Sequence, residues 1–371
     1  MSRHTIPVLV FAVLLVLVPS LLVAQSLLPL YTGKSGKLVI DRMYGGDLDD
    51  PDNFFYLPVD IALDSNDNLF VLDNKAYCIK KFAPDGTLLK TFGRKGEGPG
   101  EMIGAYSMAV DPDGNVLVFD VMNSRRFSFY DNQGNFLKAV SLTEFGFKNI
   151  TGMAIAPRGD LLVSIKSKDY FKPDSKTIFS VARFDLETRQ EQPIDSVAVR
   201  DMYTRQDGQT WQMASVPFHP DLLWGIAPSG NIVVADSDTY RIRIYSPEYK
   251  LLYERTLTGR ERPVTQEDKD DYFDSFNDDN LVEWLKKKAE FPGRMPWFDR
   301  LYIDHEGYIL LKIDDIGDDT QLYDVLDPTG ERINTIELPK LGGATVFSKG
   351  YIYTTGLHDE QDYVVYRYRL E

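Results

Sequence analysis

The sequence predicts an all-β fold, a six-bladed β-propeller made of four-stranded antiparallel blades. A unit of roughly 45 residues recurs along the chain, and each unit consists of short apolar strands separated by turn sequences. The 21 Tyr and 21 Phe residues also suit strands better than helices. A closed ring of repeats explains how 371 residues can form one large domain instead of two or three.

The repeat is clearest in residues 58–92, 106–140 and 222–257. Each unit opens with an apolar strand, and a turn such as DPDGN at 111–115 then reverses the chain into a second strand. A third strand, another turn and a fourth strand complete the unit. Four antiparallel strands in a repeated unit are typical of a propeller blade.

The second strand of each unit gives the blade count. The predicted starts are Asn68, Asn115, Asp160, Asn231, Tyr308 and Tyr351, at intervals of 47, 45, 71, 77 and 43 residues. Six starts predict six blades, and the two long intervals predict insertions. The last unit lacks one strand, whereas residues 37–43 (KLVIDRM) form an extra strand before the first unit. Pairing this strand with the last blade would close the ring and remove two open sheet edges.

The N-terminal segment predicts export. Residues 1–24 have a short polar start and an apolar stretch that ends at Ala24, as in a secretory signal peptide. The remaining chain, with the propeller at 37–371, is then periplasmic or extracellular. An uncleaved anchor is the alternative, because 19 mostly apolar residues could just span a bilayer. No other membrane signal is present in the sequence.

The net charge limits the classes of partner, and the cysteine content excludes internal disulfides. Without residues 1–24 the chain has 40 basic and 56 acidic side chains, a net charge near −16. Such a surface repels nucleic acid, which excludes that class of partner. The single cysteine, Cys78, allows no internal disulfide and lies in a strand-like run, where we expect it to be buried.

Strand order predicts where a ligand would bind. In a four-stranded blade, the loop between strands two and three and the link to the next blade lie on the same face. The long insertions, at residues 167–176, 193–220 and 257–297, are all of these two kinds. We call this side the insertion face and the opposite side the far face. Elaborated loops on a rigid scaffold are common binding sites, so we expect any ligand on the insertion face.

The insertion at 257–297, between blades four and five, is predicted to be partly helical. TQED at 265–268 resembles a capping box, and Leu281, Trp284 and Leu285 follow helical spacing before Pro292. Two interpretations remain open: a helix packed against the propeller rim, or a lid that contacts a partner, with Trp284 as a contact residue.

Acidic and basic residues recur with the repeat. Asp73, Asp120 and Asp236 end second strands, and Arg125 and Arg241 stand five residues after the latter two. These acids could ligate a metal around the channel, or they could make a structural bond in each blade. Because a catalytic residue is normally unique, recurrence favours the structural interpretation. All five residues remain candidates for the ligand-binding face.

The linker GRKGEGPGE at 93–101 has four glycines and two basic residues, Arg94 and Lys95. A phosphate loop would continue into a helix with Lys-Ser or Lys-Thr, and this segment continues into a strand instead. We interpret it as a blade linker, with anion contact through Arg94 and Lys95 as the alternative.

PVDIALD at 58–64, GNVLVFD at 114–120 and DSDTYR at 236–241 resemble NHL repeats, and the linker at 93–101 resembles that of exported bacterial six-bladed propellers. The resemblance covers about residues 37–371 and implies the same fold. Similar amidating lyases bind zinc through three histidines, and similar lactonases bind calcium through acids and amides near the channel. Here the insertion face offers two weak metal candidates, His219 and His358.

The sequence contains no complete catalytic set, so an enzyme is not favoured and no cofactor is predicted, although calcium or zinc remains open. Our leading hypothesis is an exported, non-enzymatic binding or scaffold propeller. It would engage a protein, peptide or glycan through the insertion face, where aromatic residues are frequent. The rival is a metal-dependent hydrolase or lyase of the lactonase or amidating-lyase type, with its site at the central channel.

Overall fold

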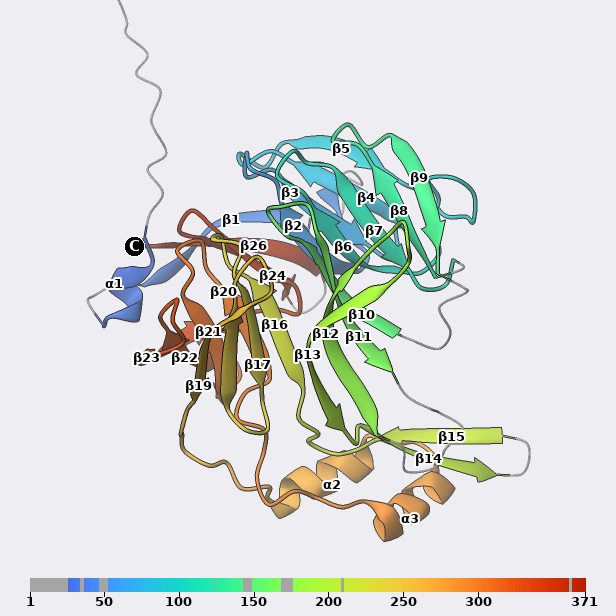
Figure 1. Cartoon of the computed structure of the whole chain (residues 1–371), viewed down its shortest axis with the longest axis vertical. Coiled ribbons are helices and arrows are strands. Elements are labelled where there is room, and N and C mark those ends of the chain that lie inside the picture. The colour runs from blue at the N-terminus through green and yellow to red at the C-terminus, as the bar shows by residue number, and fades with distance from the viewer. Residues whose placement is uncertain are drawn as a thin grey trace, which may run out of the picture.

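The computed structural model describes residues 26–33, 37–46, 53–123, 125–142, 149–167, 176–207, 210–359 and 362–371. Within these residues the chain forms six four-stranded antiparallel sheets, a separate two-stranded hairpin and three helices (Figure 1). The sheets are the blades of a propeller, so the predicted fold class is confirmed. The predicted signal peptide, residues 1–24, lies outside the described residues.

The first three blades follow one another along the chain. Blade one contains β2 (Pro58–Leu63), β3 (Leu69–Asp73), β4 (Cys78–Phe82) and β5 (Leu88–Phe92). Blade two contains β6 (Ala105–Val110), β7 (Val116–Asp120), β8 (Arg126–Tyr130) and β9 (Phe136–Ser141). Blade three contains β10 (Asn149–Ile155), β11 (Leu161–Ser167), β12 (Thr177–Phe184) and β13 (Glu191–Val199).

The remaining blades repeat this order. Blade four contains β16 (Leu222–Ile226), β17 (Ile232–Asp236), β18 (Arg241–Tyr245) and β19 (Leu251–Thr256). Blade five contains β20 (Arg300–Ile303), β21 (Ile309–Ile316), β22 (Thr320–Leu326) and β23 (Arg332–Pro339). Blade six contains β24 (Thr345–Ser348), β25 (Tyr351–His358), β26 (Asp362–Leu370) and β1 (Leu38–Gly45). Each second strand begins at, or one residue after, its predicted start.

The N-terminal strand closes the ring as predicted. β1 pairs antiparallel with β26, with Leu38 opposite Leu370 and Gly45 opposite Val364. The carboxylate of Asp41 accepts a hydrogen bond from Nε of Arg367 at 2.6 Å. A backbone ladder and an ion pair therefore join the two ends of the chain within one blade.

The strands form where they do because of turn chemistry and apolar patterning. In blade two, Oδ1 of Asp111 accepts the backbone N–H of Asn115 at 2.8 Å, and Gly114 takes a φ of 83°. This left-handed conformation costs glycine least, so the sequence fixes the turn between the first two strands. The second strands β3, β7 and β17 are buried along their whole length. The core therefore lies between neighbouring blades.

Two insertions combine into a small unit that we call the cap. It consists of the hairpin β14 (Met202–Asp207) and β15 (Thr210–Ser215) and the helices α2 (Gln266–Asp274) and α3 (Asp279–Lys288). Figure 1 places these four elements together beyond the ends of blades three and four. The predicted capping box is present, since Thr265 and Asp268 cap the start of α2 reciprocally.

The cap corrects two expectations. The insertion after blade three does not begin at Pro193, because β13 continues to Val199. Proline has no N–H to donate, and β13 is an outer strand with an irregular register opposite Ala182, so Pro193 fits there. The second insertion forms two helices, where the sequence predicted a single one. They share a hydrophobic cluster with the β14–β15 hairpin and do not pack only on the propeller rim.

A short helix precedes the ring. Helix α1 (Leu28–Tyr31) packs on the cluster between blades five and six through Leu27 and Tyr31, which are almost completely buried. The packed chain thus begins before residue 37. None of the helices in the described residues is both long enough and apolar enough to cross a membrane.

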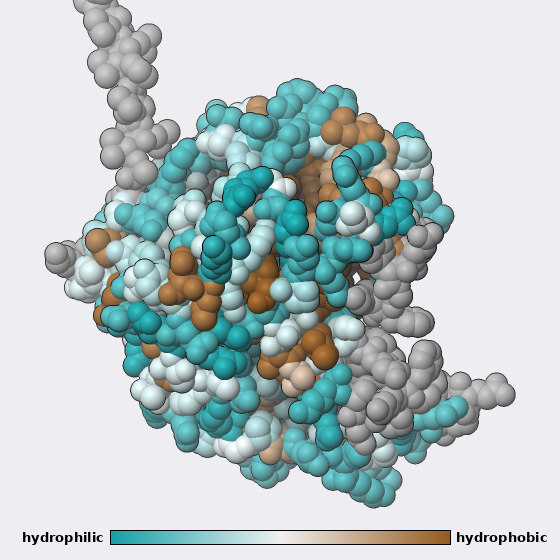
Figure 2. Space-filling model, viewed as in Figure 1, coloured by the Kyte–Doolittle hydropathy of each residue, from teal (hydrophilic) through white to brown (hydrophobic). Residues whose placement is uncertain are grey.

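The outer surface in Figure 2 is mostly hydrophilic, with apolar side chains in small separate patches. Exposed apolar residues such as Leu89, Leu137 and Leu251 lie on the outer strands β5, β9 and β19. Scattered residues of this kind are normal for a soluble surface and do not define a binding site.

Candidate functional site

The central channel divides into two halves of different character. The innermost strands β2, β6, β10, β16, β20 and β24 line it, and their inner edges carry backbone groups without a neighbouring strand. The half toward the insertion face is a hollow of about 600 Å³, and the half toward the far face is a hollow of about 750 Å³. Both halves are lined by Asp60, Ile61 and Trp224, so they meet at these residues.

Polar side chains gather in the half toward the insertion face. Its lining includes Asp60, Tyr106, Ser107, Thr151, Ser164, Lys166, Asp221, Asp299, Arg300 and Thr345. The far half is lined mainly by apolar side chains, among them Ile61, Val110, Met153, Ile155, Leu301 and Phe347. A ligand that enters from the insertion face therefore meets charges first and an apolar wall deeper in the channel.

Asp60 lies at the boundary between the two halves. Its Oδ2 accepts the backbone N–H of Met108 from blade two at 2.7 Å, and its Oδ1 accepts the N–H of Ile61 at 2.9 Å. Burial raises the pKa of this carboxyl to about 7, although the hydrogen bonds from Met108, Ile61 and Ser107 oppose the shift. Asp60 can therefore carry or release a proton near neutral pH.

Two ion pairs flank the channel. Lys166 lies 4.0 Å from the carboxylate of Asp221, and its ammonium is 4.0 Å from the centroid of the Phe179 ring. In blade five, the buried Lys312 donates to Asp299 and Asp315, each at 2.8 Å. Burial disfavours the Lys312 ammonium, but these two carboxylates still raise its pKa. Lys312 therefore stays charged and paired with both carboxylates.

The recurring acids hold loops and do not line the channel. Asp73 accepts the backbone N–H groups of Tyr56, Leu57 and Ala76. Asp120 does the same for Ile103, Met122 and Asn123, and it is 1% exposed. Asp236 accepts from Asp238 and Thr239. Each carboxylate ties the end of a second strand to neighbouring loop backbone, which supports the structural interpretation.

The expected Asp–Arg pairing holds in one blade only. Arg241 lies 3.2 Å from Asp236 in blade four, whereas Arg125 donates to Asn149 of blade three at 3.0 Å. The reason is the length of the turn, which is one residue longer in blade two, so that Arg126 lies opposite Asp120 in the strand register as Arg241 lies opposite Asp236. Neither Arg125 nor Arg241 lines the channel.

The linker at 93–101 is a tightly hydrogen-bonded loop. Arg126 donates to the carbonyl oxygens of Glu97, Gly98 and Glu101, at 2.7–2.8 Å. Nε of Arg94 donates to Glu101 at 2.8 Å, and Lys95 lies 5.2 Å from the Tyr77 ring centroid. These contacts support the interpretation as a linker, although the Arg94 side chain is 78% exposed to solvent.

Trp284 belongs to the core of the cap. Its ring lies edge-on to Tyr203, with centroids 6.3 Å apart, and the Arg205 guanidinium is 5.1 Å from the Trp284 ring. Tyr203, Ala214 and Leu285 form the buried centre of the same cluster. Trp284 is only partly buried, so part of its surface remains open to a partner.

The two histidine candidates lie on different blades and in different surroundings. His219 contacts the carbonyl oxygen of Pro220 at 3.0 Å and borders a groove of about 470 Å³ beside α2. His358 contacts the Tyr366 hydroxyl at 3.2 Å. Within the described part of the chain, no three His, Cys, Asp or Glu side chains come close enough together to hold a metal ion.

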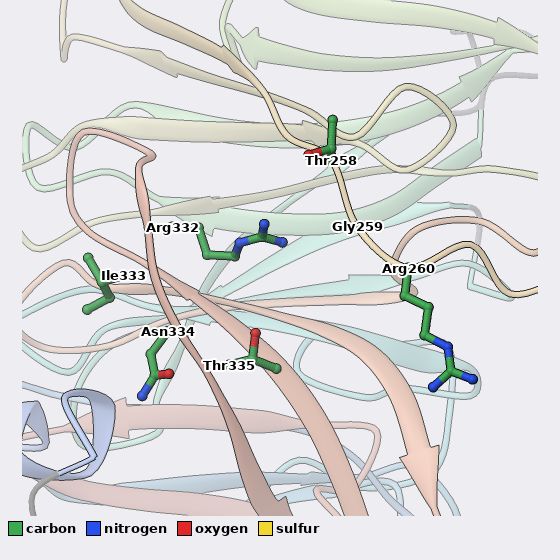
Figure 3. A pocket seen from close by; sticks show the side chains of 7 residues that line it. All are labelled: Thr258, Gly259, Arg260, Arg332, Ile333, Asn334 and Thr335. Atoms are coloured by element: carbon green, nitrogen blue, oxygen red, sulfur yellow. The ribbon is translucent and has the colours of Figure 1, made fainter.

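A second hollow, of about 560 Å³, lies on the outer rim. It is lined by Thr258, Gly259 and Arg260 of the link after blade four and by Arg332, Ile333, Asn334 and Thr335 of β23. Figure 3 shows the Arg332 side chain reaching from β23 toward the link near Gly259. Arg332 donates to the buried Asp324 of the neighbouring strand β22 at 2.8 Å, and Asp324 also accepts the Tyr240 hydroxyl of blade four. The hollow is open and shallow, and the channel is the better enclosed site.

The channel residues were missed because a sequence pattern does not show which residues of a strand face a channel. One signal was available: Asp60 and Ser107 are polar residues within apolar first strands, PVDIAL and AYSMAV. Lys166 lies on the second strand of blade three and Asp221 lies in the link before blade four, so only the folded ring brings them together.

Comparisons with known proteins agree with this architecture. Residues 55–82 match the NHL repeat. Over 126 residues, 32% of this chain, the sequence is 32% identical to peptidyl-glycine alpha-amidating monooxygenase A of Xenopus laevis. The match spans 13% of that protein's length, so it says nothing about the rest of that protein.

Two solved structures share the fold across most of the chain. A gluconolactonase from Xanthomonas campestris has a TM-score of 0.50 at 13% identity and covers 94% of both chains. A member of the DUF4221 family from Bacteroides vulgatus has a TM-score of 0.55 at 12% identity and covers 91% of this chain and 98% of its own. At these identities the likeness shows the fold alone.

Proposed function

We propose that this NHL-type propeller is an exported binding protein that holds a protein, peptide or glycan ligand at its insertion face. The observation that carries the proposal is the polar half of the channel, which opens on the face that also bears the cap. Concave sites that combine a few charges with an apolar wall are typical of ligand pockets.

The cap supports the proposal as a second contact surface. The groove beside α2 is lined by Val216, Pro217 and Phe218 on one side and by Asp268, Asp271 and Tyr272 on the other. Its mixture of apolar and acidic side chains suits contact with a polypeptide. Because the cap has a hydrophobic cluster of its own, it can present this groove as a preformed surface.

Binding assays on arrays test the proposal directly. The mature protein is labelled and applied to peptide and glycan arrays, beside Lys166→Gln at the channel mouth and Arg158→Gln on the far face. Arg158 is 57% exposed and pairs with Glu248, so its replacement is a matched loss of one charge outside the site. We expect Lys166→Gln alone to weaken binding. Equal binding by all three proteins, or no binding to either array, would overturn the proposal.

The rival function is a metal-dependent hydrolase or lyase, and the partial match to the amidating monooxygenase is the observation that favours it. Metal analysis of the purified protein, with lactone and amide-type substrate screens, decides between the two. Stoichiometric calcium or zinc whose removal abolishes turnover would replace the binding hypothesis with the enzymatic one.

A further inference from the structure

The polar half of the channel, toward the insertion face, contains two ionisable side chains that form no ion pair among the described residues. Five of the seven ionisable side chains that line this half are accounted for: Lys166 pairs with Asp221, Asp299 pairs with Lys312, and Tyr106 and Tyr302 are phenols. Asp60 and Arg300 remain. Asp60 has only backbone and hydroxyl donors around its carboxyl group, and no described acid forms an ion pair with Arg300.

Arg300 is left unpaired by the arrangement of blade five. It begins β20 and lies opposite Lys312 in the strand register. Two acids of the same blade, Asp299 and Asp315, are both bound to the Lys312 ammonium. Arg300 is exposed and lines the polar half of the channel, so its guanidinium is available to an anionic group of a ligand.

Asp60 is the second group without an ionic partner, and its charge is opposite to that of Arg300. It lies on β2 in blade one, deeper in the channel, where the polar and apolar halves meet. Trp224 lines the same boundary from β16 in blade four, on the opposite side of the six-bladed ring. A carboxylate on one wall and an indole ring on the other are two groups that attract an ammonium ion.

We infer that the channel binds a small zwitterion, an amino acid or short peptide with free termini, whose ammonium group is held by Asp60 and whose carboxylate is held by Arg300. An apolar side chain of the ligand would contact Met153, Ile155 and Leu301 in the far half. The inference rests on the proposed function and narrows its ligand, since a neutral glycan has neither charged group.

Binding of an ammonium group should favour the ionised form of Asp60. The groups that face its carboxyl are the Ser107 hydroxyl and the N–H groups of Ile61 and Met108, none of which titrates. The charged groups farther along the same half are Lys166, Asp221, Asp299 and Arg300. We therefore expect affinity for the zwitterion to rise as the pH increases from about 5 to about 7, a range in which the terminal amine of a peptide, with a pKa of about 7.7–8.0, stays mostly protonated.

Calorimetry with a set of dipeptides tests the inference. The probes have free termini and carry apolar, polar or charged side chains, and each is paired with an N-acetylated form and a C-amidated form. Maltotriose serves as the neutral glycan. We expect at least one free dipeptide to bind and each capped form to bind at least about tenfold more weakly, as the loss of one charge-assisted hydrogen bond predicts.

Substitutions test which residue binds each end of the ligand. Asp60→Asn should remove the preference for the free amine, and Arg300→Gln should remove the preference for the free carboxylate. Arg260→Gln is the matched control, since Arg260 is an exposed arginine of the rim hollow outside the channel. Trp224→Phe should remove the change in tryptophan fluorescence on binding. Thermal unfolding of every variant verifies that it is folded.

The outcomes separate this inference from the proposed function. Capped and free dipeptides that bind equally would overturn the zwitterion site, as would unchanged selectivity in Asp60→Asn and Arg300→Gln. Binding of maltotriose without any dipeptide would overturn the zwitterion and leave a binding propeller in place. Failure of every probe, together with empty peptide and glycan arrays, would reject both.

Discussion

The ion pair that closes the ring should contribute measurably to stability, and Asp41→Asn tests it. Asp41 is on β1 and Arg367 is on β26, so this pair joins the first and last strands of the propeller. Asparagine keeps the size of the side chain and removes its charge. The Arg367 guanidinium, with a side-chain exposure of 10%, would then lack its carboxylate partner.

The expected cost follows from burial. Breaking a fully buried pair costs about 3–5 kcal/mol, and an exposed pair is worth about 0–1 kcal/mol. The Asp41 side chain is 22% exposed, and Arg367 keeps hydrogen bonds to the Pro84 carbonyl and the Tyr44 hydroxyl. We therefore expect Asp41→Asn to lower the free energy of unfolding by about 2–3 kcal/mol.

Urea unfolding and hydrogen exchange measure the effect. Arg94→Gln is the control, because the Arg94–Glu101 pair is also short, at 2.8 Å, but the Arg94 side chain is 78% exposed, so losing this pair should cost less stability than losing the Asp41–Arg367 pair. In Asp41→Asn, amide exchange in β1 should accelerate more than exchange in the central strand β17. Equal stability of the two variants, or uniform acceleration of exchange, would refute the reasoning.

Three further predictions concern backbone space, the cap and the channel. Gly342→Ala should lower the free energy of unfolding by about 3 kcal/mol or more, because the added Cβ would lie 1.7 Å from the Thr355 carbonyl oxygen. Gly343→Ala is the control, since a Cβ at Gly343 would have open space and should not change stability. Thermal unfolding of both variants measures the difference. Leu285→Ala should destabilise the cap by about 2–4 kcal/mol, because Leu285 is in the buried centre of its hydrophobic cluster. Amide exchange should then accelerate in α2 and α3, while the blades keep their protection. Loss of protection in the blades as well would show that the cap has no core of its own. Asp60→Asn should change the pH dependence of stability, because burial raises the pKa of the carboxyl from 3.8 to about 7, so the wild type loses stability as the pH rises between these values. Across this pH range the free energy of unfolding of the variant should rise by up to about 2–4 kcal/mol relative to the wild type, and above about pH 7 the difference should stay constant. Urea titrations at several pH values measure this difference. A difference that does not vary with pH would contradict an elevated pKa.

The fold was predictable because its signals are local and repeated. The turn around Asp111 and Gly114 and the apolar second strands use chemistry that acts over a few residues, so six copies could be counted. Ring closure was predictable by elimination, since the last unit lacked one strand and the chain began with a spare one. The capping box at Thr265 was visible for the same local reason.

The candidate site was much less predictable. The recurring acids and Trp284 stood out in the sequence, yet the acids bind loop backbone and Trp284 packs beside Tyr203. Arg125 shows why spacing misleads, since a turn that is one residue longer places Arg126 opposite Asp120, while Arg125 binds Asn149. A residue that recurs with the repeat often stabilises each blade and does not bind a ligand.

The sequence by itself determined the number of blades, their strand order and the face that carries the insertions, because hydrophobic period, turn residues and strand alternation are properties of neighbouring residues. Only the tertiary structure decided which charges meet. Asp60 and Arg300 are separated by 240 positions and lie on different blades, and the closed ring brings them to one channel. Neither Asp60 nor Arg300 has an oppositely charged partner among the described residues of the ring. This depends on the arrangement of all the blades, so no single segment of the sequence could show it.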